Sequence, residues 1–168
     1  TAHFAPVLSM TIPTATGTGN ATFTIDGAAG CRIEQAGFVP APLPAPAQGT
    51  EFPHGLVSFV LGGCTPGASA QVTITFPQSV QGMQYWKRLA NASWLSMPAT
   101  FSGNTVSFSI QDNGAFDLDA TPGVIRDPSG PGAQAAAPVP VPGLSREALL
   151  LVGLLLLSAV WYLRRKNS

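Results

Sequence analysis

The sequence predicts an all-β protein: an immunoglobulin-like antiparallel β-sandwich, followed by a proline-rich linker and a single C-terminal transmembrane helix. Glycine (18) and proline (16) account for 34 of the 168 residues, which favours short strands and turns over long helices. Apolar and polar residues alternate in several short runs. An uncharged run of 16 residues near the C-terminus ends in a basic cluster. We therefore divide the chain into an N-terminal strand or remainder of an upstream region (1–19), the sandwich (20–132), the linker (133–143) and a C-terminal tail (144–168).

The strands are predicted from alternation with a period of two, which places every second side chain on one face. The runs are Thr22–Ile25, Leu56–Leu61, Val72–Phe76, Met83–Leu89 and Val106–Ile110. Leu56–Leu61 is more continuously apolar than the others, as expected for a central strand. Ser102–Thr105 is predicted to form a two-residue hairpin, because Gly103 and Asn104 tolerate positive φ. No segment before residue 143 shows a helical apolar stripe.

Cys31 and Cys64 are the only cysteines. An even number of cysteines in an exported domain predicts a disulfide, which stabilises a loop of this length by about 3–4 kcal/mol in the chain-entropy model. Two free buried thiols and an intermolecular bond are the competing interpretations. Zinc would need more ligands, since His3 and His54 are the only histidines.

The charges are few and unevenly placed. Charged residues make up 10% of the chain, against roughly 25% in typical soluble domains. Residues 1–143 have seven acidic and four basic side chains, a net charge of −3, whereas the last 25 residues are basic. A mildly acidic body has no electrostatic reason to bind nucleic acid.

The apolar run Ala148–Leu163 predicts the membrane helix. As a helix it is about 24 Å long, slightly short of the hydrocarbon core, and flanking arginines can extend its reach. Trp161 and Tyr162 suit the interface, and the cluster of Arg164, Arg165 and Lys166 places this end in the cytoplasm. A buried core helix is the alternative, but that helix would show a polar face.

Two clusters in the body are candidate binding sites. Asp112, Asp117, Asp119 and Asp127 form the densest acidic region. Their oxygens can bind calcium, or they can cap backbone amides in Asx turns. Tyr85, Trp86 and Trp94 can form a sugar-stacking platform, or they can pack within the fold. An enzyme is not expected, because neither a Gly-x-Ser-x-Gly elbow nor a metalloprotease histidine motif occurs and His54 lies in a turn between Pro53 and Gly55.

The tail also carries a family resemblance. The order of Val139–Ser145 (VPVPGLS), an apolar helix and Arg-Arg-Lys resembles the IPTL-CTERM family of protein-sorting tails. Pro142, Leu144 and Ser145 match the short motif of that family, whereas Gly143 stands where threonine is usual. The resemblance implies recognition by an exosortase, a membrane cysteine protease-transpeptidase that processes surface proteins of Gram-negative bacteria.

The body resembles the choice-of-anchor U domain over roughly residues 20 to 132. The matching segments are Phe52–Leu56, Gly63–Ala68, Tyr85–Lys87, Ile125–Pro128 and Gly130-Pro131. That domain occurs in bacterial surface proteins with alternative C-terminal sorting tails. The resemblance implies location and architecture rather than an activity.

Together these features predict an exported bacterial surface protein with a structural or adhesive role. Its body would lie in the periplasm while the tail is in the inner membrane, and at the outer surface or outside the cell after processing. The expected partners are membrane lipid, an exosortase-type enzyme, and surface polysaccharide or other surface proteins. The alternative is a calcium- or carbohydrate-binding surface module.

Overall fold

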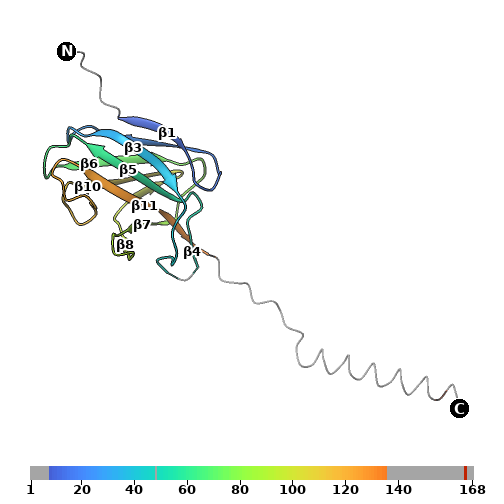
Figure 1. The fold of residues 1–168 in the computed structure, drawn as a ribbon. Coiled ribbons are helices and arrows are strands. Elements are labelled where there is room, and N and C mark those ends of the chain that lie inside the picture. Colours follow the sequence, from blue (N-terminus) through green and yellow to red (C-terminus); the bar gives the residue numbers. More distant parts are fainter. Residues whose placement is uncertain (1–7, 48, 136–164, 166–168) are drawn as a thin grey trace. The chain divides into compact units, whose positions relative to one another are not determined.

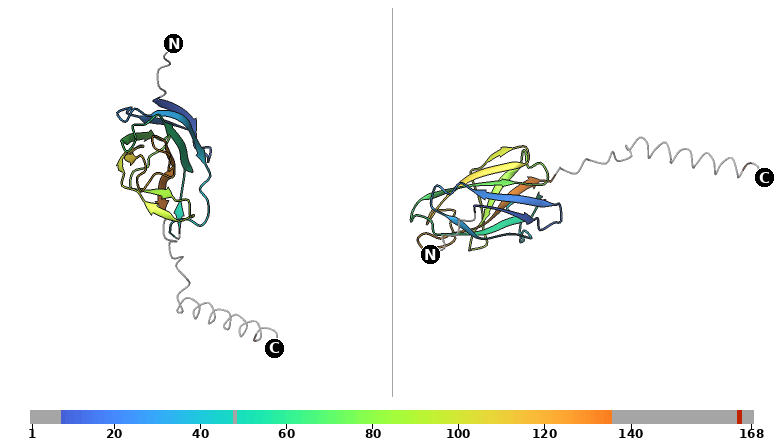
Figure 2. Two further views of the ribbon diagram at one scale, coloured as in Figure 1. Left: turned by 60° about the vertical axis from the view of Figure 1, so that its left-hand side comes forward. Right: turned by 90° about the horizontal axis from the view of Figure 1, so that it is seen from above.

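The structure is a computed structural model that describes residues 8–47, 49–135 and 165. Residues 8–135 form two antiparallel sheets that pack face to face, with the hydrophobic core between them (Figure 1; Figure 2). The predicted all-β antiparallel sandwich is confirmed.

The first sheet has the strand order β1-β2-β6-β10-β9. Its strands are β1 (Ser9–Pro13), β2 (Asn20–Ile25), β6 (Ser69–Thr75), β10 (Thr105–Gln111) and β9 (Thr100–Ser102). On the inner face, Ile74 of β6 lies opposite Phe23 of β2 and Val106 of β10, and all three are fully buried. On the outer face, the hydroxyls of Thr73 and Ser107 meet at 3.1 Å. The alternation in the sequence therefore separates an apolar interior from a hydroxyl-rich surface.

The second sheet has the strand order β3-β5-β11-β7-β8, and β4 pairs with the end of β11. Its strands are β3 (Arg32–Val39), β4 (Thr50–Glu51), β5 (Leu56–Gly62), β7 (Gln84–Arg88), β8 (Trp94–Ser96) and β11 (Ile125–Gln134). β5 lies between β3 and β11, which confirms its prediction as a central strand. β11 was not predicted. It contains Pro128 and Pro131 and pairs with β5 up to Ser129 and with β7 from Ser129 onward, so each ladder along this proline-containing strand is short.

The structure moves two of the expected boundaries. β1 pairs with β2, so the sandwich already includes part of the region 1–19. Ala133 and Gln134 pair with Glu51 and Thr50, so these two residues belong to the sandwich rather than to the linker 133–143. The interpretation of 133–134 as linker overlooked β4, which is too short to show alternation.

Two local predictions are confirmed. Ser102 and Thr105 pair across a two-residue turn in which Gly103 has a φ of 59°. Cys31 and Cys64 form a disulfide that joins the start of β3 to the segment after β5. Both half-cystines are buried, and neither cysteine is free.

The predicted membrane helix Ala148–Leu163 and sorting motif Pro142, Gly143, Leu144 and Ser145 lie outside the described residues. Of the basic cluster only Arg165 is described, and it is exposed; Arg164 and Lys166 lie outside. Among the residues that the structure describes, no helix is both long enough and apolar enough to cross a bilayer.

Candidate functional site

Asp112 lies at the end of β10 and connects two loops. Its Oδ2 accepts a hydrogen bond from the Gly67 amide at 2.8 Å, and its Oδ1 accepts one from the Gly123 amide at 2.9 Å. The side-chain amide of Asn113 donates a third hydrogen bond at 3.2 Å. These donors, the Gly67 amide first, hold the pKa of Asp112 below its usual value. The carboxylate therefore acts as a structural anion inside the fold.

Asp117 and Asp119 organise the loop that follows. Asp117 Oδ1 accepts hydrogen bonds from the amides of Asp119 and Arg126, both at 2.9 Å, and its Oδ2 accepts one from the Asn113 amide at 2.9 Å. Asp119 Oδ1 accepts a hydrogen bond from the Thr121 amide at 3.0 Å, which is the main cause of its lowered pKa. These are the Asx-type turn contacts that the sequence offered as the alternative to calcium.

The four predicted calcium ligands do not converge on one point. Asp117 and Asp119 border a shallow hollow of about 230 Å³, which is lined by Asn113, Gly114, Asp117, Leu118, Asp119 and Ala120. Asp127 lies apart from them, because its side chain is fully buried against Lys87. Within residues 8–47 and 49–135, no group of three or more His, Cys, Asp and Glu side chains is placed to hold a metal ion.

Of the three aromatic side chains, Tyr85 and Trp94 pack within the fold, which is the alternative to a sugar-stacking platform. Tyr85 is only 1% exposed and points into the sandwich, whereas its neighbour Trp86 lies on the opposite face of β7 and is half-buried. Trp94 of β8 lies opposite Arg88, whose guanidinium carbon is 4.9 Å from the Trp94 ring centroid. Phe52 stacks on the same ring at 5.0 Å. Trp94 is thus packed between neighbours rather than presented as a free stacking surface.

His54 is a buried side chain. Its Nδ1 is 2.8 Å from the hydroxyl of Thr18, and its ring stacks on Phe76 with the centroids 4.9 Å apart. Its Nε2 has no hydrogen-bond partner among the described residues. Burial lowers the pKa of His54, so the ring is neutral at physiological pH. The position suits packing rather than acid–base chemistry.

A buried polar network was missed by the sequence analysis. Lys87 of β7 forms an ion pair with Asp127 of β11, and both side chains are 0% exposed. Asp127 Oδ2 accepts a hydrogen bond from Ser129 at 2.6 Å, and the Ser129 hydroxyl is 3.1 Å from the hydroxyl of Tyr85. Part of the signal was present in the sequence: Tyr85 and Lys87 are two residues apart in a strand, so they share one of its faces, although the spacing does not give the partner Asp127.

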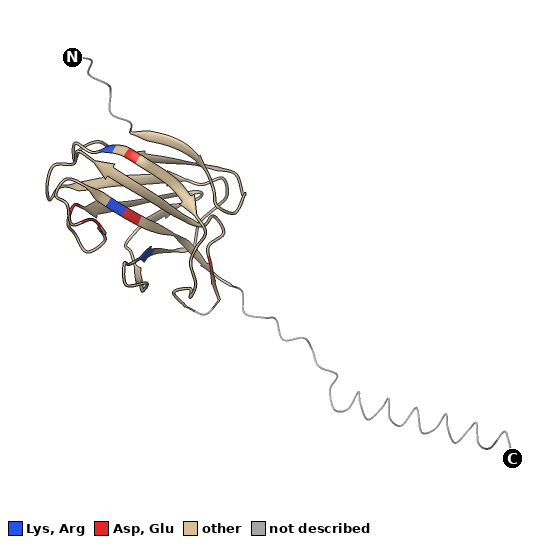
Figure 3. Cartoon of the chain, viewed as in Figure 1, with Lys and Arg blue, Asp and Glu red and all other residues tan. Residues whose placement is uncertain are grey.

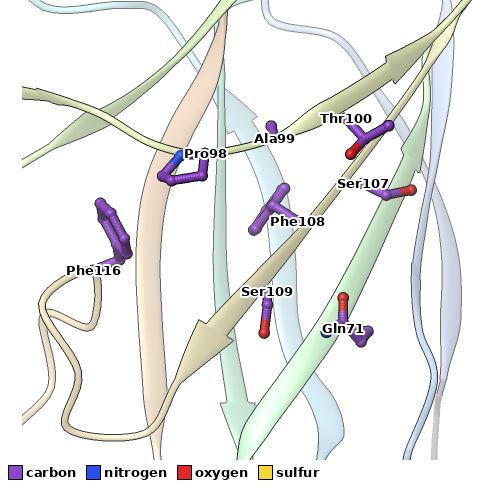
Figure 4. A pocket seen from close by; sticks show the side chains of 8 residues that line it. All are labelled: Gln71, Pro98, Ala99, Thr100, Ser107, Phe108, Ser109 and Phe116. Atoms are coloured by element: carbon purple, nitrogen blue, oxygen red, sulfur yellow. The ribbon is translucent and has the colours of Figure 1, made fainter.

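A hollow of about 550 Å³ runs beside β10 (Figure 4). It is lined by Gln71, Pro98, Ala99, Thr100, Ser107, Phe108, Ser109 and Phe116. Figure 4 shows Phe116 at one end and the polar side chains of Gln71 and Ser107 at the other. This surface is not apparent from the sequence, because its residues come from four separate segments.

Comparisons of the chain with models of protein families, with curated proteins and with solved structures give no match.

Proposed function

We propose that the chain is an exported bacterial cell-surface protein with a structural or adhesive role, displayed through its C-terminal tail. The observation that supports this most directly is the buried disulfide between Cys31 and Cys64. Disulfides form and persist in oxidising compartments and are rare in the cytosol. A body stabilised in this way belongs outside the cytoplasmic membrane.

The surface of the sandwich supports the same function. Figure 3 shows that charged residues occupy only a few short stretches of the sandwich ribbon, and two of these residues, Lys87 and Asp127, are fully buried. Pairs of hydroxyls, such as Ser9 with Thr24 and Thr73 with Ser107, occupy outer positions of the first sheet. Such a surface presents many hydrogen-bonding groups and little net charge, as suits contact with polysaccharide or with other surface proteins.

The acidic, basic and histidine side chains discussed above have structural roles. Asp112 and Asp117 bind backbone amides, Lys87 is paired with Asp127, and His54 is packed on Phe76. We therefore assign the described residues a binding or structural role rather than a catalytic one.

The tail supplies the proposed means of display. Ala148–Leu163 would hold the chain in the inner membrane, with the Arg164–Lys166 cluster in the cytoplasm. Proline at 142 disfavours a helix that runs through it from the preceding residue, so we expect a non-helical backbone where the Pro142–Ser145 motif begins, which a membrane protease could bind. A folded domain followed by a proline-containing motif, an apolar helix and a basic cluster is the order expected of an exosortase-processed surface protein of the choice-of-anchor type.

A reporter fusion tests the display step. Residues 136–168 are joined to a secreted reporter in a Gram-negative host, and a control fusion carries Leu155→Arg and Leu156→Arg. We expect the first reporter in the membrane fraction and the control in the soluble fraction. Soluble reporter of full size from the unmodified fusion would falsify membrane retention. Reporter that remains full-length in membranes with a cognate exosortase present would remove the processing step and leave a simple anchor.

A carbohydrate-binding module is the second candidate, and the hollow beside β10 favours it. Phe116 offers an aromatic face, and Gln71, Ser107 and Ser109 offer hydrogen-bonding groups along the same surface. If this candidate is correct, Phe116→Ala weakens glycan binding on an array at least tenfold, whereas Phe52→Ala, a change outside this hollow, does not. Equal binding by both variants, or no binding by the unmodified chain, would exclude this hollow as the glycan site.

A further inference from the structure

The ion pair between Lys87 and Asp127 joins two neighbouring strands inside the sandwich. Lys87 lies opposite Ser129 in the pairing of β7 with β11, so Asp127, two residues before Ser129, projects from the same inner face. Both side chains are 0% exposed, and Lys87 Nζ contacts Asp127 Oδ1 directly. An amine and a carboxyl group are thus held together where water is excluded.

We propose that Lys87 and Asp127 condense to an intramolecular isopeptide bond between Lys87 Nζ and Asp127 Cγ. The reaction starts with transfer of one proton from the ammonium group to the carboxylate, which gives a neutral amine and a neutral carboxylic acid. Nζ then attacks Cγ, the new C–N bond forms, and the bond from Cγ to one carboxyl oxygen breaks. That oxygen leaves as water with one proton from the amine and one from the acid. No oxidant or external reagent is needed.

The surroundings favour the neutral pair that this reaction needs. Burial lowers the pKa of Lys87 and raises the pKa of Asp127, so both groups shift toward their uncharged forms. A neutral, desolvated lysine is a nucleophile, whereas an ammonium ion is not. In an ion pair exposed to water, the lysine would stay charged and hydrated, and the carboxyl group would stay ionised.

Ser129 and Tyr85 complete the site. The Ser129 hydroxyl donates to Asp127 Oδ2, which polarises the carboxyl group toward attack and stabilises the negative charge that develops on oxygen. The Tyr85 hydroxyl lies 3.1 Å from the Ser129 hydroxyl, which is placed to donate to it, and burial followed by the charge of Asp127 raises the pKa of Tyr85 well above its usual value, so Tyr85 stays neutral beside the reacting groups. Fixed orientation of the two reacting groups replaces the encounter that a bimolecular condensation would require.

The bond would reinforce the strand that leads to the tail. β11 is the last strand before the segment that precedes the proposed anchor, so a pulling force on the tail enters the sandwich through β11. A covalent link from Asp127 to β7 would prevent β11 from being peeled away from that neighbour.

Mass spectrometry of the full chain tests the proposal. After reduction of the disulfide, we expect the intact mass to be lower than the sequence mass by one water molecule. Trypsin should then release residues 33–88 joined to residues 127–146, because it does not cut after an acylated Lys87 but still cuts after Arg88, Arg126 and Arg146. This peptide distinguishes the bond from loss of water elsewhere, such as succinimide formation at Asp26-Gly27.

Two variants serve as controls. Lys87→Arg keeps the positive charge but cannot form the amide, so its mass should equal that of its sequence. Ser129→Ala should lower the cross-linked fraction at least tenfold at a fixed time after synthesis. Because either variant can fold poorly, the unmodified chain decides: recovery of Lys87 only in unlinked peptides, at the full sequence mass, would overturn the proposal.

Discussion

At the residue scale, a few buried polar groups hold the loops of the sandwich in place. Asp112 is 2% exposed and accepts hydrogen bonds from its neighbour Asn113 and from Gly67 and Gly123, which lie in two other loops. The sequence indicated that Asp112 belonged to an acidic turn. It did not indicate that the partners would be amides some 45 residues before and 11 residues after it, because those contacts depend on how the sheets pack.

We predict that Asp112→Ala lowers the free energy of unfolding by about 3 kcal/mol, because the buried amide of Gly123 and the partly buried hydrogen bond of the Gly67 amide lose a charged acceptor. Asp26→Ala is the matched control: Asp26 is exposed and accepts a hydrogen bond from Ala28, so its loss should cost well under about 1 kcal/mol. Denaturant unfolding followed by tryptophan fluorescence measures both. Equal stabilities of the two variants would show that Asp112 does not connect the loops.

The free energy of unfolding depends on pH through His54, and the sign of this dependence follows from the lowered pKa of its ring. The unfolded chain binds a proton below about pH 6.5, whereas the buried ring in the folded chain resists protonation. The free energy of unfolding is therefore not reduced by His54 above about pH 6.5. Below that pH it falls, because the unfolded chain takes up a proton that the folded chain resists.

The corresponding measurement is the melting temperature between about pH 7.5 and pH 5, above the range in which most carboxylates titrate. We expect a decline for the unmodified chain and a flatter profile for His54→Gln. Identical profiles would mean that His54 is not protonated differentially between the folded and unfolded states.

At the element scale, the sequence predicted the strands that alternate and missed those that do not. β2, β6 and β10 show strict alternation because one face meets the core and the other meets solvent. β11 was missed because Pro128, Gly130, Pro131 and Gly132 are typical of a loop, and only the division of its pairing between β5 and β7 makes a strand possible. β3 was missed because a register shift between Ile33 and Gln35 interrupts its period.

The disulfide reinforces one end of the pairing between β3 and β5, because Cys31 lies just before β3 and Cys64 lies two residues after β5. Replacing Cys31 and Cys64 together by alanine should lower the free energy of unfolding by about 3–4 kcal/mol, since it removes a cross-link that spans 33 positions. The change should equal the difference between the oxidised and reduced forms of the unmodified chain. A double variant as stable as the oxidised chain would show that the disulfide does not stabilise the fold.

At the scale of the whole molecule, the described residues form a hydroxyl-rich, charge-poor sandwich with the disulfide between Cys31 and Cys64 in its core. The sequence was sufficient for the fold class, the disulfide and the central position of β5. It was insufficient for the interior pairing of Lys87 with Asp127, since a charged residue in an amphipathic run is ordinarily assigned to the solvent face. It also left open whether Tyr85 belongs to a stacking platform or packs within the fold, and the structure shows that Tyr85 is buried on the inner face of β7 with Lys87.

Protease treatment of intact cells that produce the protein, followed by detection of the sandwich in the membrane and medium fractions, tests export and surface display most directly. The account predicts that external protease removes the body from the cells, that thiol reagents added before lysis do not label Cys31 or Cys64, and that any body released without protease lacks the residues after the Pro142–Ser145 motif. A full-length chain protected from protease in the cytosolic fraction, with both cysteines reduced and labelled, would contradict it.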